Sequence, residues 1–168
     1  MSKSTLCSLP AAFTVLVTLA WLSTAADNEN PVPEDFEVFA QYGPGFSGWK
    51  AWNTTITKDG TVVQQVFEDS DWKAKNGPAL SQKAAGELWT MVKDARFFDL
   101  KSKHDFPVTD HPTLVLKVTT DKKTHEVSDY APNGVEDRDA VKRFTKVWSE
   151  ILRKVPSPNL ESVPKGNG

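Results

Sequence analysis

Hydrophobic and polar positions alternate over two segments in the first half of the chain. Residues 36–42 and 49–69 are rich in aromatic and β-branched side chains, which is typical of extended strands. Asp59 and Gly60 divide the longer segment, and an Asp-Gly pair between extended runs predicts a β-hairpin whose two central residues have positive φ. The pattern therefore predicts three consecutive strands.

The hydrophobic period then changes to that of a helix. Apolar residues within 84–95 recur at intervals of three and four, and Ser81 is placed to cap the first turn. Residues 113–120 and 124–130 alternate again on either side of a short turn. The last segment, residues 137–155, has the clearest amphipathic pattern of all. Its apolar face consists of Val141, Phe144, Trp148, Ile151 and Val155.

The order and spacing of these elements indicate the fold class. Consecutive strands joined by short turns favour an antiparallel sheet, and two helices with one apolar face each need a sheet face to cover. We therefore predict an α+β domain in two layers. Its antiparallel sheet has about five strands, the element order is β-β-β-α-β-β-α, and both helices pack on one face.

The N-terminus has the three-part layout of a secretory signal peptide. Lys3 precedes an apolar run of about 13 residues, and the small residues Ser23 and Ala25 follow it. Because a helix needs roughly 20 apolar residues to span a bilayer, we expect cleavage rather than a retained anchor. Cys7 precedes the apolar run, so it is not placed for lipid attachment. The sequence predicts an exported protein, periplasmic or extracellular, that is not a lipoprotein.

Composition divides the chain into four segments. We predict a signal peptide at residues 1–26, a flexible tether at residues 27–34, a single α+β domain at residues 35–155 and a disordered tail at residues 156–168. The tether and the tail are assigned because both are polar and rich in proline.

Cysteine content and charge exclude several classes of function. The single cysteine, Cys7, falls in the predicted signal peptide, so we expect no disulfide, thiolate metal site or cysteine nucleophile in the mature protein. The formal net charge is −2 and charges of both signs are mixed along the chain, which gives no electrostatic footprint for nucleic acid. We expect a monomer without a nucleic-acid partner, a cofactor or a transmembrane segment after cleavage.

Two histidines and two carboxylates lie close together in the stretch KHDFPVTDHP, at His104, Asp105, Asp110 and His111. Imidazole and carboxylate groups together suit zinc, iron or manganese, so this cluster is a candidate metal site. Its spacing matches no metal-binding motif. The alternative is a loop of solvated charges in which Asp110 bonds to the local backbone ahead of Pro112.

Other polar groups have structural interpretations. His125 shares one side of a predicted strand with Val127 and Asp129, which predicts a hydrogen-bonded structural histidine at the sheet margin if Val127 faces the core. The carboxylates within residues 68–71, beside Trp72, are interpreted as a solvated loop. No serine lies in a Gly-x-Ser-x-Gly elbow between a strand and a helix, so the sequence indicates no catalytic residue.

The stretch QYGPGFSGWKAW, residues 41–52, combines glycines with aromatic side chains. Trp49 and Trp52 have opposite parity in the predicted strand, and we expect Trp52 in the core and Trp49 on the uncovered sheet face. With Tyr42 and Phe46, an exposed Trp49 is a candidate anchor for a partner protein or an envelope glycan. The alternative is that Phe46 packs back over the end of the sheet and the glycines only permit the turn.

Several short motifs occur in an order that resembles a protein family. DGTV, LSQKAAGELWTMV, ARFFDL, TDHPTLVLKV and HEVSDY, within residues 36–152, are similar to those of a family of small exported bacterial domains of unknown function. The resemblance implies an exported bacterial domain and supplies no catalytic residues. Many relatives place cysteines in the glycine-rich loop. Here GPGFSGW has none, which excludes a loop disulfide or a redox role.

These patterns lead to three hypotheses for function. The leading one is a non-enzymatic exported domain that binds a protein or an envelope component through Tyr42, Phe46, Trp49 and the uncovered sheet face. The first alternative is a small metal-dependent enzyme that uses the His and Asp cluster at residues 104–111. The second is a purely structural protein of the envelope.

Overall fold

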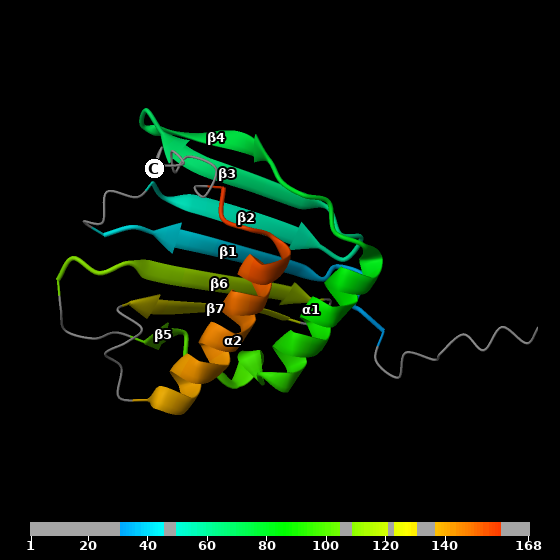
Figure 1. Cartoon of the computed structure of the whole chain (residues 1–168). Helices are drawn as coiled ribbons and strands as arrows, with labels where there is room; N and C mark the ends of the chain where they lie inside the picture. The colour runs from blue at the N-terminus through cyan, green and yellow to red at the C-terminus, as the bar shows by residue number, and fades with distance from the viewer. Residues whose placement is uncertain (1–30, 46–49, 105–108, 121–122, 131–136, 159–168) are drawn as a thin grey trace, which may run out of the picture.

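The computed structural model shows one sheet covered on one face by two helices (Figure 1). The helices are α1 (Gln82–Asp94) and α2 (Arg138–Lys154), and both lie on the same side of the sheet. The predicted α+β class is confirmed. Neither helix of the described part of the chain is long and apolar enough to cross a membrane. The structure describes residues 31–45, 50–104, 109–120, 123–130 and 137–158.

Parts of the predicted domain organisation lie outside the described residues. These are the signal peptide, the first half of the tether and most of the tail. The described part of the tether includes Val32, which packs against the core, and Glu34, which pairs with Lys58.

The sheet combines a four-stranded meander, a separate hairpin and one short parallel strand. Its spatial order is β4-β3-β2-β1-β6-β7-β5 (Figure 1). Neighbouring strands are antiparallel, except that β5 pairs in parallel with β7. The strands are β1 (Glu37–Gly43), β2 (Trp52–Thr57), β3 (Val62–Glu68), β4 (Asp71–Asn76), β5 (Lys103–His104), β6 (Thr113–Thr120) and β7 (Lys123–Tyr130).

The prediction of an antiparallel sheet of about five strands was wrong in detail, because the described sheet is mixed and has seven. β4 was missed because DWKAKN lacks a hydrophobic alternation and lies exposed at the sheet edge. The carboxylates at residues 68–71 therefore belong to a hairpin rather than to a solvated loop. β5 was missed because it has two residues, and its pairing with Ser128 and Asp129 depends on the tertiary structure.

The turns that join β2 to β3 and β3 to β4 also differ from the expectation. Asp59 and Gly60 do lie between β2 and β3, but only Gly60 has positive φ, at 86°. Asp59 instead accepts hydrogen bonds from the threonines on both sides of it, which closes a wider turn. The two-residue turn with positive φ at both positions joins β3 to β4, at Asp69 (52°) and Ser70 (67°).

Side chains from both helices and the covered sheet face form one hydrophobic core. Ser81 caps α1 as predicted and Asp137 caps α2, and each accepts a hydrogen bond from a backbone N–H three residues later. Arg143 on α2 donates to the carbonyl oxygens of Ala95 and Arg96, which satisfies the C-terminal end of α1 and joins the helices. The largest fully buried side chains include Phe36, Ile56, Leu88, Phe97, Leu116, Phe144 and Ile151.

Strand alternation gives the sheet a covered face and an open face. On β1, Val38 and Ala40 are buried beneath the helices, whereas Phe39 and Gln41 point away from them. Through the strand registers, the buried Ile56 and Val66 also lie on the covered face. No described helix lies on the open face (Figure 1).

Candidate functional site

The glycine-rich loop is described only at its two ends. Phe46 and Trp49, two of the predicted binding residues, lie outside the described residues. Tyr42, the third, is half-buried on the covered face, and its ring stacks on Trp52 with centroids 6.0 Å apart at 15°. Trp52 is buried in the core, as predicted. Tyr42 therefore extends the core toward the loop and does not lie on the open face.

One glycine of this loop is required by a close backbone approach. Gly45 has a φ of 57°, and a Cβ at this position would lie 2.7 Å from the carbonyl oxygen of His111 and 2.8 Å from that of Asp110. Any other residue would force the two segments apart. The interpretation that the glycines make room for the backbone has direct support at this position.

The described members of the predicted metal cluster occupy two different environments. Asp105 lies outside the described residues. Asp110, with a φ of 71°, and His111 are exposed ahead of β6, whereas His104 is buried in β5. Within the described residues, no three His, Cys, Asp or Glu side chains converge as a metal site.

His125 has the structural role that the sequence predicted. Its Nε2 lies 2.9 Å from the carbonyl oxygen of Leu100, and its ring packs against the edge of Phe97 with centroids 5.7 Å apart. Val127 is buried in the core, as that prediction required. The hydrogen bond links β7 to the segment that follows α1.

A second histidine forms a buried pair that the sequence analysis did not connect. His104 of β5 lies beside Asp129 of β7 in the strand register, and Asp129 shares the core-facing side of its strand with Val127. Asp129 is 0% exposed and His104 is 5% exposed. Neither oxygen of the Asp129 carboxylate has a hydrogen-bond partner, and neither does the Nε2 of His104.

The surroundings of this pair perturb the carboxyl group. On the other side of Asp129, β6 contributes the apolar Leu114. Burial raises the pKa of Asp129 above its ordinary value, and the neighbouring His104 opposes this shift. The signal in the sequence was an Asp at a core-facing position of a strand, two residues after the buried Val127.

A second candidate surface lies on the open face of β2, β3 and β4. The two exposed large hydrophobic side chains of the described chain, Val63 (49%) and Phe67 (42%), both lie there on β3. Phe67 is opposite Trp72 of β4, and their rings meet edge to face with centroids 5.4 Å apart. We call this surface the open patch. It consists of Asn53, Thr55, Thr57, Val63, Gln65, Phe67, Trp72, Ala74 and Asn76.

Planar amide groups lie beside these rings in the open patch. Asn53 on β2 is opposite Gln65 on β3, and its Nδ2 donates to the Gln65 Oε1 at 3.1 Å. Asn53 is almost fully buried, although no described helix lies on this face of the sheet. The sequence analysis missed this surface because β4, which supplies one edge of it, was not predicted.

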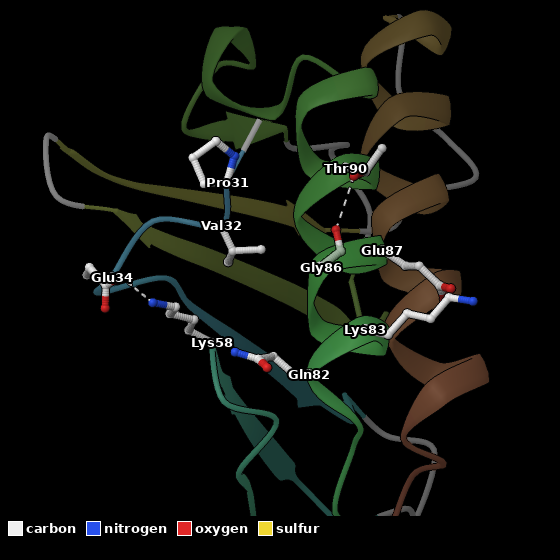
Figure 2. Close-up of a pocket in the computed structure, with 9 residues that line it drawn as sticks. All are labelled: Pro31, Val32, Glu34, Lys58, Gln82, Lys83, Gly86, Glu87 and Thr90. Carbon is white, nitrogen blue, oxygen red and sulfur yellow. Dashed lines mark hydrogen bonds and ion pairs between the residues drawn. The ribbon is translucent and has the colours of Figure 1, made fainter. Parts of the chain in front are cut away.

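A groove of about 700 Å³ lies between α1 and the segment that precedes β1 (Figure 2). Glu34 pairs with Lys58 on one side of it. On the helix side, Glu87 pairs with Lys154 and the Thr90 hydroxyl donates to the Gly86 carbonyl. These polar groups already satisfy one another or the backbone, so the groove gives no independent indication of a ligand.

Sequence comparison places the chain in a family. The family described as a domain of unknown function (DUF6438) matches residues 50–152. The match runs from the start of β2 through most of α2, so it includes both the open patch and the pair of His104 and Asp129. The predicted resemblance to a small domain family of unknown function is confirmed. No curated protein matches the chain.

Proposed function

The chain belongs to the DUF6438 family of domains of unknown function, and we propose that it is a non-enzymatic, exported module that binds a neutral saccharide on the open patch. The observation that carries the proposal is a polar surface without charge that exposes aromatic rings at one edge. Tyr42 does not take part, since its ring packs against the core on the covered face.

The absence of charge favours a neutral ligand. None of the open-patch side chains is ionisable, while the charged residues Glu68, Lys73 and Lys75 of β3 and β4 have the opposite parity and belong to the covered side. A charged ligand would find no complementary group on this surface. A saccharide instead needs hydroxyl and amide partners, which the patch supplies.

The aromatic pair offers an apolar face to a sugar ring. Phe67 is exposed and Trp72 is half-exposed, and the two rings pack against each other edge to face. Amphipathic aromatic rings give a large contact area for little loss of conformational entropy. Such rings can pack against the C–H groups of a sugar without requiring a fixed charge.

The side-chain amides of Asn53 and Gln65 would orient a bound sugar through hydrogen bonds. In the Asn53–Gln65 pair, one donor and one acceptor are used internally, which holds both planar groups in place. The Gln65 amide nitrogen and the Thr55 hydroxyl of the same face are then available groups for hydroxyls of a bound sugar. Preorganised polar groups of this kind reduce the entropy lost on binding.

The predicted export signal agrees with this ligand class. A protein delivered to the periplasm or the exterior meets the glycans of the envelope there, and a binding module needs no cofactor. The candidate signal peptide at residues 1–26 is the basis of this part of the proposal.

Affinity electrophoresis through gels that contain neutral polysaccharides tests the proposal. The purified protein should be retarded by at least one of β-glucan, glucomannan, dextran or hydroxyethyl cellulose. Phe67→Ala and Trp72→Ala should each weaken that retardation about tenfold, since loss of one ring contact removes roughly 1.4 kcal/mol. Isothermal titration with the matching oligosaccharide gives the stoichiometry.

A control variant separates binding from general surface change. Glu126→Gln alters an exposed side chain of β7 on the same open face but distant from the patch, and it should bind like the parent. Equal retardation of the parent and both aromatic variants would refute the site. Retention of a protein from envelope extract that depends on Phe67, without retardation by any polysaccharide, would refute the ligand class.

A further inference from the structure

The pair of His104 and Asp129 has no place in the saccharide site, because both side chains lie on the covered face. Four buried side-chain nitrogen or oxygen atoms in the described residues lack a hydrogen-bond partner, and three of them belong to this pair. Buried polar groups are almost always satisfied, so an orphaned cluster requires an explanation. An ion or a water molecule held between the groups is the usual one.

Other buried polar side chains of the described chain behave differently. Asn53 bonds to Gln65, and Gln64 bonds to Thr54. Each of these groups is neutral and reaches a partner on the neighbouring strand. Asp129, by contrast, is an ionisable group at the same depth, and none of the ion pairs of the described residues includes it.

The chemistry of the two groups selects the occupant. A water molecule could bond to one carboxylate oxygen and to the imidazole, but the other carboxylate oxygen would stay unpaired, and His104 would be the only neighbour that balances the buried charge of Asp129. A divalent cation satisfies both the lone pairs and the charge. An imidazole nitrogen beside a carboxylate favours a transition metal over calcium or magnesium, which prefer oxygen ligands alone.

We propose that His104 Nε2 and the Asp129 carboxylate are protein ligands of a divalent transition-metal ion, with Zn²⁺ as the reference cation, at the β5 edge of the sheet. Water completes the coordination, since no third His, Cys, Asp or Glu among the described residues joins the pair. β5 is the outermost strand on this side of the sheet, and His104 is 5% exposed.

This site differs from the metal cluster expected from the sequence. It keeps His104 but replaces its sequence neighbours with Asp129, which lies 25 residues further along the chain and comes close only through the parallel pairing of β5 with β7. Asp110 and His111 are exposed elsewhere and take no part.

Zinc titration of chelator-treated protein tests the proposal. The parent should bind one Zn²⁺ per chain by calorimetry, and its melting temperature should rise with zinc, because a ligand that binds the folded state stabilises it. His104→Gln and Asp129→Asn should each lower the affinity at least about tenfold and abolish the thermal shift. Cobalt substitution gives a spectroscopic check, since the visible Co²⁺ bands should change in His104→Gln.

A matched histidine variant supplies the control. His111→Gln removes an exposed imidazole seven residues from His104 and should bind zinc like the parent. Circular dichroism establishes that each variant is folded before its affinity is compared. No heat and no thermal shift in the parent at millimolar zinc would overturn the proposal. Equal affinity in the parent and both ligand variants, or loss of binding in His111→Gln alone, would also overturn it.

Discussion

Two regions of buried polar groups, one near each end of α2, differ in whether their hydrogen bonds are satisfied (Figure 1). Just beyond the C-terminal end, buried Gln64 donates to the Thr54 hydroxyl at 3.1 Å and to the Pro156 carbonyl oxygen at 3.0 Å. The other region is beside β5, which Figure 1 shows toward the N-terminal end of α2. There Asp129 of β7 pairs with β5 in the strand register and is buried with both carboxylate oxygens unpaired. The first arrangement stabilises the fold, whereas the second destabilises it unless something else binds there.

The pKa shifts follow the same division. Near the C-terminal end of α2, a hydrogen bond from Arg153 lowers the pKa of Glu150, and one from Lys154 lowers the pKa of Glu87. At the other end, burial raises the pKa of Asp129. The ionised forms of Glu150 and Glu87 therefore stabilise the folded protein, whereas the ionised form of Asp129 destabilises it.

The largest change in the free energy of unfolding is expected for the hydrogen-bonded Gln64. Gln64→Ala removes one buried and one partly buried hydrogen bond and leaves the Pro156 carbonyl without its side-chain donor, so we expect a loss of about 2–3 kcal/mol in the free energy of unfolding. Urea denaturation measures it. Gln65→Ala, the next residue and on the open face, removes the one hydrogen bond from Asn53 and should lose about 1 kcal/mol. Equal losses would show that the tie to Pro156 contributes nothing.

A substitution of the unpaired Asp129 is expected to raise the free energy of unfolding rather than lower it. Asp129→Asn removes a buried carboxylate that has no hydrogen-bond partner, so metal-free protein at neutral pH should gain roughly 1–2 kcal/mol in the free energy of unfolding. The same urea titration with chelator present measures this gain. Asp110→Asn changes an exposed carboxylate and should stay within about 0.5 kcal/mol of the parent. A clear loss in Asp129→Asn would mean that the carboxylate is paired in solution, and the contrast would disappear.

The smallest effect concerns the pH dependence at the C-terminal end. The pKa of Glu87 is lowered from 4.5, so its stabilising contribution is present above pH 4.5 and is lost as the pH falls through the lowered value. Glu87→Gln should therefore melt slightly below the parent at neutral pH and converge with it in acid. Thermal melts over this range measure the difference, which salt should reduce because the pair is exposed. A difference that grows in acid would contradict this assignment.

Much of the fold was readable because it depends on local pattern. The stripes of α1 and α2, the Ser81 cap and the hairpin of β6 and β7 all arise from neighbours in sequence, and the structure has them. The burial of Trp52 and the hydrogen bond of His125 followed from strand parity, which is also a local property.

The features that escaped prediction depend on distant partners. β4 has no hydrophobic alternation and forms because a two-residue turn at Asp69 and Ser70 returns the chain along β3. The open patch could not be assembled without it. The metal cluster expected at residues 104–111 stays a prediction, because Asp105 lies outside the described residues. Nearness along a loop does not determine which side chains share a buried space, and among its described members His104 is buried whereas Asp110 and His111 are exposed.

The α+β class, the amphipathic helices and the core-facing side of each central strand could be predicted from the amino-acid sequence, because each depends on a periodicity of a few residues. Which polar groups meet depends on the tertiary fold. Strand order and register place Asn53 against Gln65 and His104 against Asp129, and these are pairings between segments far apart in the chain. The physical reason is that burial can be read from alternation, whereas the partner of a buried polar group is set by the packing of the whole sheet.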